Sequence, residues 1–164
     1  MNVGIRHVEP EGYEAMHRTM TDPGVVADTM QLPLQPVEIW RKRLAGPPEG
    51  LHLLLAVVEG EVVGNAGIHT EPLRWRRRHV GYLGISVIGG WQGKGIGSQL
   101  MQTDLDLADN WLNLTGIELE VYTDNAAAIA LYKKFGVELE VTHRRYAFRD
   151  GEFVDAYSMA RLKL

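Results

Sequence analysis

Glycine is concentrated in one short stretch of the chain. Of the 18 glycines, seven lie between residues 81 and 97, namely Gly81, Gly84, Gly89, Gly90, Gly93, Gly95 and Gly97. A residue without a side chain adopts left-handed backbone conformations easily and lets another backbone or a ligand approach closely. Because this stretch follows a run of β-forming residues and precedes a helical apolar stripe, it predicts a strand that turns into a helix beside a ligand.

The segment from Gln92 to Ser98, Gln-Gly-Lys-Gly-Ile-Gly-Ser, predicts an anion site at the start of that helix. The first N–H groups of a helix have no intrahelical partner and lie at the positive end of its dipole, so they favour a phosphate. The alternative is a glycine turn that only joins the strand to the helix. A P-loop needs Ser or Thr at Gly95, and a dinucleotide fingerprint from Gly93 needs Gly or Ala at Ser98, so neither ATP nor NAD is favoured.

Hydrophobic periodicity gives the order of the remaining elements. We expect strands at residues 3–8, 51–58, 61–70, 79–87, 117–122, 137–148 and 152–162, and helices at residues 10–20, 36–45, 95–112 and 125–135. Pro23-Gly24 predicts the end of the first helix. The order β-α-α-β-β-β-α-β-α-β-β predicts an α/β (α+β) fold with a single mixed, largely antiparallel sheet of about seven strands, flanked by about four helices. With no repeat or linker, residues 1–164 are expected to form one domain.

Charge and composition exclude several classes of function. The formal net charge is 17 − 21 = −4, which gives no overall attraction to nucleic acid. The chain contains no cysteine, which removes disulfides, thiolate metal sites and cysteine nucleophiles. No segment approaches the roughly 20 apolar residues of a membrane span, and His69, His79 and His143 lack metal-ligand spacing. We therefore expect a cytoplasmic protein with no metal and no nucleic-acid or membrane partner.

Two segments carry a family resemblance. Ile85-Ser86-Val87 followed by Trp91 to Gly97 resembles the acetyl-coenzyme A motif of the GNAT superfamily of N-acetyltransferases, Gln/Arg-x-x-Gly-x-Gly/Ala. The family's next strand and helix resemble the segment with Leu119-Glu120-Val121, Asn125, Ala128, Leu131-Tyr132 and Phe135-Gly136. The two ends of the chain, Ile5-Arg6-His7 and residues 146–161, are similar to a bacterial subgroup that acylates free L-amino acids.

The resemblance implies acetyl-CoA as the cosubstrate. In the family, the strand that here holds Ile85 and Val87 diverges from the strand after it, and the pantetheine arm pairs with the exposed backbone. Asn125 would offer its amide to that arm, or would only cap its helix. The residues expected to contact the coenzyme are Ile85, Ser86, Val87, Gln92, Gly93, Lys94, Gly95, Ile96, Gly97, Ser98, Asn125, Ala128 and Tyr132.

Direct attack of an amine on the thioester needs a neutral amine, a polarised carbonyl and a proton for the leaving sulfur. Tyr132 matches the family's general acid, and core packing is its alternative role. Tyr82 stands near the position where several family members carry a glutamate base, and a tyrosine is a poor base at neutral pH. Glu120 is the candidate base instead, unless it belongs to a solvated strand face. Backbone N–H groups near Val87 would polarise the carbonyl.

The acceptor is expected between the first two helices and the centre of the sheet, where Thr29, Gln31, Trp40 and Tyr82 are candidates. The basic cluster Arg74 to Arg78 would contact an outer phosphate or an acidic substrate, or would form a solvated loop. The sequence thus predicts an N-acetyltransferase acting on the primary amine of a small molecule such as a free L-amino acid. Two alternatives are a non-catalytic acyl-CoA sensor and an acetyltransferase of protein N-termini or lysines. Members of the family often pair through their terminal strands, so the resemblance also implies a homodimer.

Overall fold

One mixed sheet of seven strands organises the computed structural model, which describes residues 1–164. The strands lie in the order β1-β2-β3-β4-β5-β7-β6, and all neighbours except β4 and β5 are antiparallel. Their bounds are β1 (Gly4–His7), β2 (Leu51–Val58), β3 (Glu61–Thr70), β4 (Val80–Val87), β5 (Gly116–Tyr122), β6 (Glu138–Arg149) and β7 (Glu152–Leu162). The expected fold class, with seven strands in a largely antiparallel sheet, is therefore confirmed.

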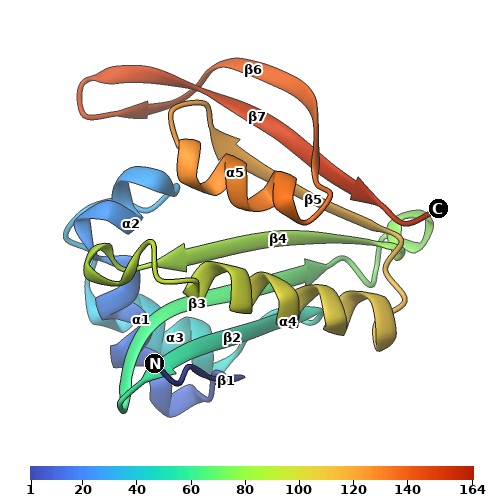
Figure 1. Ribbon diagram of the computed structural model, residues 1–164. Helices are drawn as coiled ribbons and strands as arrows, with labels where there is room; N and C mark the ends of the chain where they lie inside the picture. Colours follow the sequence, from blue (N-terminus) through green and yellow to red (C-terminus); the bar gives the residue numbers. More distant parts are fainter.

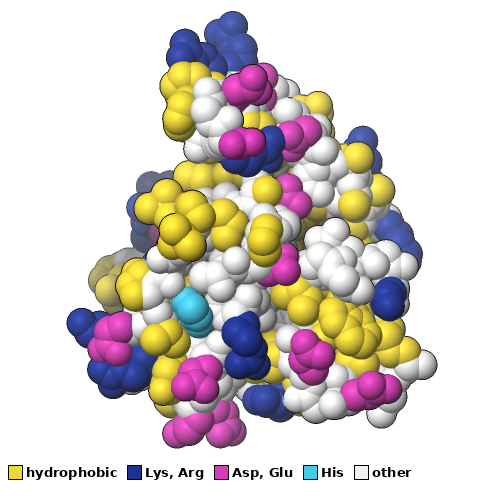
Figure 2. All heavy atoms as spheres, turned by 90° about the vertical axis from the view of Figure 1, so that its left-hand side faces the viewer, with side chains coloured by type: hydrophobic (Ala, Val, Ile, Leu, Met, Phe, Trp, Pro, Cys, Tyr) yellow, Lys and Arg dark blue, Asp and Glu magenta, His cyan; other side chains and the backbone are white.

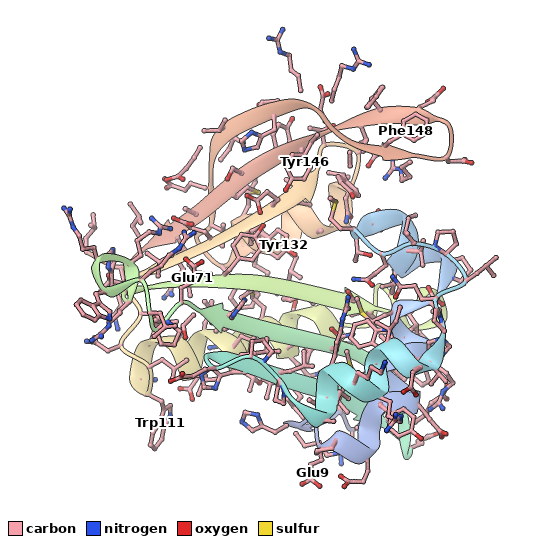
Figure 3. All side chains as sticks on the ribbon, turned by 180° about the vertical axis from the view of Figure 1, so that it is seen from behind. Glu9, Glu71, Trp111, Tyr132, Tyr146 and Phe148 are labelled. Carbon is pink, nitrogen blue, oxygen red and sulfur yellow. The ribbon has the colours of Figure 1, made fainter.

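Helices cover both faces of the sheet. They are α1 (Tyr13–Met20), α2 (Pro23–Asp28), α3 (Val37–Ala45), α4 (Ile96–Asn110) and α5 (Ala126–Lys134). In Figure 1, α4 and α5 lie in front of the sheet, and the reverse view in Figure 3 brings α1 and α3 to the front. None of these helices is long and apolar enough to cross a membrane.

Helix α2 was not predicted. Pro23-Gly24 was expected to end the first helix, but Pro23 is the first residue of a second one. The Asp22 carboxylate accepts hydrogen bonds from the N–H groups of Gly24 (3.0 Å) and Val25 (3.3 Å), which is an N-cap. Proline fits the first helical position because its missing N–H has no partner there in any helix.

The only parallel pair of strands separates along its length. Strands β4 and β5 are in register at Val80↔Gly116, Gly81↔Ile117 and Tyr82↔Glu118, and no further pairing follows. Both strands continue past this point, to Val87 and to Tyr122, and Figure 1 shows them diverging. Beyond Tyr82 in β4 and beyond Glu118 in β5, one side of each strand's backbone therefore has no neighbouring strand, as the family resemblance predicted.

The hydrophobic core lies on both sides of the sheet. On one side α4 and α5 pack against it through Leu100, Met101 and Leu105 from α4. On the other side Met16 and Trp40 pack against Leu55 of β2. The apolar stripe of α4 was expected to extend to Trp111, and this is wrong, since the helix ends at Asn110 and Trp111 is 77% exposed.

Candidate active site

A cavity of about 620 Å³ occupies the split between β4 and β5. Side chains alternate between the two faces of a strand, and paired residues share a face. The register therefore puts Tyr82, Gly84, Glu120 and Tyr122 on the face covered by α1 and α3. The same cavity is lined by the start of α4 and by α5, which lie on the opposite face. It thus passes through the sheet from one face to the other.

The α4 end of the cavity is a cradle of backbone N–H groups. Gly93 and Gly95 have φ of +73° and +83°, a region that disfavours other residues, and a Cβ added to either would meet no protein atom within 4 Å. No side chain caps the start of α4. The side-chain amide of Gln92 donates a 3.0 Å hydrogen bond to the Val87 carbonyl oxygen, which fixes the loop to the end of β4. This geometry suits a phosphate group.

Of the residues expected to contact the coenzyme, all except Lys94 line this cavity. The Lys94 ammonium instead lies 5.0 Å from the centre of the Trp91 ring, on the exposed side of the loop. Asn125 does cap α5, because its Oδ1 accepts a 3.2 Å hydrogen bond from the Ala128 N–H. The cap uses only the oxygen, so the amide nitrogen of Asn125 stays available to a ligand in the cavity.

Tyr132 extends from α5 into the middle of the cavity. Its side chain is 5% exposed, and its hydroxyl makes no hydrogen bond to the protein. Burial raises the pKa of this phenol to about 12, so it carries its proton throughout the neutral range. Tyr132 also packs in the core beside α4. Its side chain therefore both fills the core and faces the cavity.

Glu120 lies on the face of β5 opposite to the core in which Tyr132 packs, and it lines the same cavity. One of its oxygens, Oε2, is buried without a hydrogen-bond partner. Burial raises the pKa of its carboxyl, and the nearby His143 and Ser158 side chains partly oppose this. A carboxylate with a raised pKa and a free oxygen in a cavity is a candidate proton acceptor. The solvated-face alternative does not describe its surroundings.

On the acceptor side, Thr29, Gln31 and Tyr82 line the cavity and Trp40 does not. The expectation for Trp40 is corrected here: its side chain is 6% exposed and packs in the core with Met16. In the sequence, the helical spacing of Trp40 fits a residue packed in the core and a residue that contacts a ligand equally well. Sequence reasoning also missed Asp28, which lies at the mouth of the cavity because α2 was not foreseen.

Tyr146 was not predicted to line the cavity, because its position depends on an irregularity in the pairing of β6 with β7. The register between β6 and β7 shifts between His143 and Ala147, and Arg145 in this bulge has φ of +52°. The Arg145 N–H donates a 2.7 Å hydrogen bond to Asp155, which holds the bulge. Tyr146 lines the cavity, and burial followed by the Glu120 charge raises its pKa. Figure 3 labels Tyr146 on β6 and Tyr132 nearer the split.

Two contacts tie the part of the sheet formed by β5, β7 and β6 to the end of α2 and the residue after it. The Tyr122 hydroxyl donates a 2.8 Å hydrogen bond to the Thr29 carbonyl oxygen. The Arg149 guanidinium of β6 donates a 3.0 Å hydrogen bond to the Ala27 carbonyl oxygen and forms an ion pair with Asp124. We call this pair of contacts the clasp. Of the residues in the clasp, Thr29 and Tyr122 line the acceptor end of the cavity.

Residues 13–137 match the acetyltransferase (GNAT) family. This chain belongs to that family. It is 45% identical over 159 residues to the L-amino acid N-acetyltransferase AaaT of Escherichia coli (strain K12), covering 97% of each chain. The match confirms the resemblance to GNAT acetyltransferases and to an amino-acid-acylating relative that the sequence motifs indicated.

Solved structures of acetyltransferases share the fold. A GNAT acetyltransferase from Streptococcus pneumoniae superimposes with a TM-score of 0.85 at 28% identity, covering 98% of this chain and 99% of that one. The yncA protein of Salmonella typhimurium, a putative acetyltransferase solved with its cofactor acetyl-CoA, gives a TM-score of 0.83 at 18% identity and coverages of 99% and 94%.

The basic cluster of this acetyltransferase lies away from the cavity. Arg74 to Arg78 form the loop between β3 and β4, at the end where β4 and β5 are still paired, and none of the five lines the cavity. Arg77 donates a 2.8 Å hydrogen bond to Glu118, and Arg74 pairs with Glu71. These contacts favour the charged-loop alternative over contact with the coenzyme.

The cavity of the acetyltransferase contains no lysine or arginine side chain in its lining, whereas Asp28 and Glu120 contribute carboxyl groups. Figure 2 looks onto the side at which the strands have separated, where acidic side chains (magenta) lie among hydrophobic (yellow) and white surface. Carboxyl groups in the lining favour an amine over an acidic group. The acceptor end therefore suits an amine.

Proposed function

We propose that this acetyltransferase transfers the acetyl group of acetyl-CoA to the α-amino group of a free L-amino acid, by direct attack in a ternary complex. The observation that carries the proposal is the 45% identity with an L-amino acid N-acetyltransferase across almost the full length of both chains.

The glycine-rich cradle fits acetyl-CoA. Gly93 and Gly95 leave space where any other residue would put a Cβ, and the uncapped N–H groups of α4 suit the pyrophosphate. The unpaired side of β4 beyond Tyr82 suits an extended arm with amide groups, which would take the place of a neighbouring strand. When bound, acetyl-CoA supplies an activated acetyl thioester.

Glu120 receives the proton of the attacking amine in this proposal. Glu120 lies two residues beyond Glu118, the last residue of β5 paired with β4, and lines the cavity in the split where the acceptor and the thioester would meet. The raised pKa of Glu120 makes the carboxylate a stronger base than a solvated glutamate. Backbone N–H groups on the unpaired side of β4 near Val87 polarise the carbonyl.

Tyr132 holds the proton that the departing sulfur needs. A phenol with a pKa of about 12 is a weak acid toward a thiolate whose ordinary pKa is near 8.5. Burial raises the pKa of a thiol as well as that of a phenol, since both anions lose solvation in the same apolar surroundings. The burial that weakens Tyr132 as an acid therefore also makes the leaving sulfur more basic.

A panel of amines assayed with acetyl-CoA for release of free thiol tests the proposal. We expect turnover of free L-amino acids and at least tenfold lower kcat/KM for tripeptides with the same first residue. Turnover of the peptides in preference to the free amino acids would instead support acetylation of protein N-termini. Coenzyme binding without thiol release for any amine would indicate a sensor.

The proposal includes a homodimer. Strand β6 is the outer strand of the sheet, and Leu139 and Val141 on it are about half exposed. An edge strand with apolar side chains and unpaired backbone groups is a surface for pairing with a second copy. Light scattering coupled to size-exclusion chromatography gives the mass in solution, and a monomer at assay concentration contradicts this part. The cytoplasmic location expected from the sequence stays a prediction.

A further inference from the structure

Two glycines lie side by side on the acceptor face of the sheet. Gly67 of β3 is paired with Gly84 of β4, and on its other side Gly67 is paired with Leu53 of β2. Directly paired residues of antiparallel strands point to the same face. Gly84, which has no side chain, leaves a hollow in the floor of the cavity beside Gly67. We call this hollow the glycine notch, and both residues line the cavity.

The two glycines differ in what the fold requires of them. A Cβ on Gly67 would approach Leu53 Cδ1 at 3.2 Å and the His52 carbonyl oxygen at 3.3 Å, so packing within the protein explains this glycine. A Cβ on Gly84 would meet no protein atom within 4 Å, and its φ is outside the left-handed region. Glycine within a strand is unfavourable by about 0.5–1 kcal/mol relative to alanine. The fold gives no reason for glycine at position 84.

The surroundings of the notch are apolar on one side. Leu51 and Leu53 of β2 line the cavity beside Gly67, and Leu53 packs against the core formed by α1 and α3. Polar residues border the notch along the strands, with His69 paired to Tyr82 before it and Asn65 paired to Ser86 after it. Across the split, Glu120 lies on the same face of the sheet as Gly84, and both residues line the cavity. A molecule with its amine at Glu120 thus extends over Gly84 toward Leu53.

We propose that the glycine notch is the side-chain subsite of the acceptor, and that it selects L-amino acids whose side chain is apolar and larger than the methyl group of alanine. The inference rests on the proposed function and adds the class of amino acid to it. Gly84 leaves the space, Leu51 and Leu53 form the apolar wall, and the position of Glu120 directs the side chain across the notch. Contact of an apolar side chain with this wall removes its surface from water, which favours it over a polar side chain of equal size.

Three free amino acids test the selectivity of the unaltered enzyme. L-leucine and L-asparagine have nearly the same shape and differ in polarity, and L-alanine lacks the extra length. We expect kcat/KM for L-leucine to exceed that for each of the others at least tenfold. Acetylation of all three at similar kcat/KM contradicts the subsite while supporting the proposed function. If none is acetylated and a peptide amine is, the proposed function itself fails.

Gly84→Ala places a methyl group in the notch without a clash in the protein. We expect it to lower the ratio of kcat/KM for L-leucine to that for L-alanine at least fivefold, and Gly84→Val to lower the ratio further. Gly46→Ala is the matched control, because Gly46 ends α3, outside the cavity, also with no atom within 4 Å of an added Cβ. It should leave the ratio unchanged. An unchanged ratio in both Gly84 variants, with a raised KM for acetyl-CoA, would assign the space to the coenzyme and overturn the inference.

Discussion

The hydroxyl of Tyr122 on β5 donates a 2.8 Å hydrogen bond to the carbonyl oxygen of Thr29, 93 residues earlier in the chain. Its ring lies 5.2 Å from the Arg149 guanidinium, which reaches the Ala27 carbonyl oxygen on the same segment. Strand pairing cannot connect the two parts of the sheet here, because β4 and β5 have separated. The clasp supplies this connection at the end of the cavity where the acceptor is expected.

Tyr122→Phe is expected to raise the KM for the amine several-fold and to leave the KM for acetyl-CoA nearly unchanged. The variant loses the hydrogen bond that holds the Thr29 segment and keeps the aromatic ring, so stability should fall by only about 1 kcal/mol. Steady-state kinetics with each substrate varied in turn measures the two constants. Tyr13→Phe, on α1 and outside the cavity, is the control. Equal increases in both KM values would contradict a role confined to the acceptor end.

Gly95→Ala is expected to weaken acetyl-CoA binding at least tenfold. The substitution forces alanine into φ of +83°, at a cost of about 1 kcal/mol, and puts a methyl group into the cradle. Gly60→Ala separates these effects, because Gly60 has φ of +81° in the β2–β3 turn, with no atom near an added Cβ and no contact with the cavity. Isothermal titration should show weaker binding only for Gly95→Ala. Similar acetyl-CoA affinities for the two variants would show that the cradle is not part of the coenzyme site.

Tyr132→Phe is expected to lower kcat by about 10²-fold, which is within the range for loss of a general acid, with acetyl-CoA affinity changed less than threefold. The hydroxyl has no hydrogen bond to the protein, so its removal leaves the packing of the ring intact. Tyr157→Phe is a control, since Tyr157 packs against the same core and does not line the cavity. Equal losses of turnover and affinity in Tyr132→Phe would indicate that the residue acts through packing.

Local patterns in the sequence were sufficient for most of the fold. The Glu59-Gly60 turn, the glycine-rich loop after β4 and Asn125 before α5 each have a backbone reason that is visible within a few residues. Pro23 was misjudged because proline occurs both after the end of a helix and at the first position of a new one. Asp22, directly before Pro23, is the local signal that distinguishes the two, since its carboxylate caps α2.

The acceptor end was harder to predict because it is assembled from distant segments. Tyr146 reaches the cavity through a bulge whose hydrogen bond to Asp155 spans the β6–β7 hairpin. Gly84 looked like one more residue of a glycine-rich stretch until the strand register put it beside Gly67. The prediction that Trp40 contacts the acceptor was wrong, because core residues and cavity-lining residues of a helix have the same spacing in the sequence.

Glu120→Gln is expected to change the shape of the pH profile as well as the rate. Burial raises the pKa of Glu120, and a base acts only when deprotonated, so kcat/KM is lost as the pH falls through that pKa. The amine must also lose its proton, so the acid limb of log kcat/KM should steepen from a slope of about one to about two below the pKa of Glu120. In the variant the slope should stay near one and the rate at neutral pH should fall about 10²-fold.

Glu118→Gln is the control for this profile, because Glu118 lies on the same face of β5 but pairs with Arg77 outside the cavity. It should keep the profile of the unaltered enzyme. If Glu120→Gln retains both the rate and the steeper limb, the amine loses its proton without Glu120.

Asp104 is expected to make the protein less stable as the pH rises. The side chain lies on the buried face of α4 with 0% exposure, and neither carboxylate oxygen has a hydrogen-bond partner. Burial raises its pKa from 3.8 to about 7, so the folded protein keeps this proton at pH values where the unfolded chain has lost it. The stabilisation is complete below the unfolded pKa and is lost as the pH rises through the folded pKa, which amounts to about 3 kcal/mol between pH 5 and pH 8.

Asp104→Leu, which has a similar shape and no charge, should therefore gain stability relative to the unaltered protein as the pH rises, with a change of about 3 kcal/mol between pH 5 and pH 8. Urea unfolding at both pH values measures this difference, and subtracting the unaltered protein cancels the other titrating groups. Asp106→Asn on the exposed side of the same helix should give a difference near zero. If the effect of Asp104→Leu does not depend on pH, the Asp104 carboxyl has the same pKa in the folded and unfolded states, which contradicts the raised pKa in the folded protein.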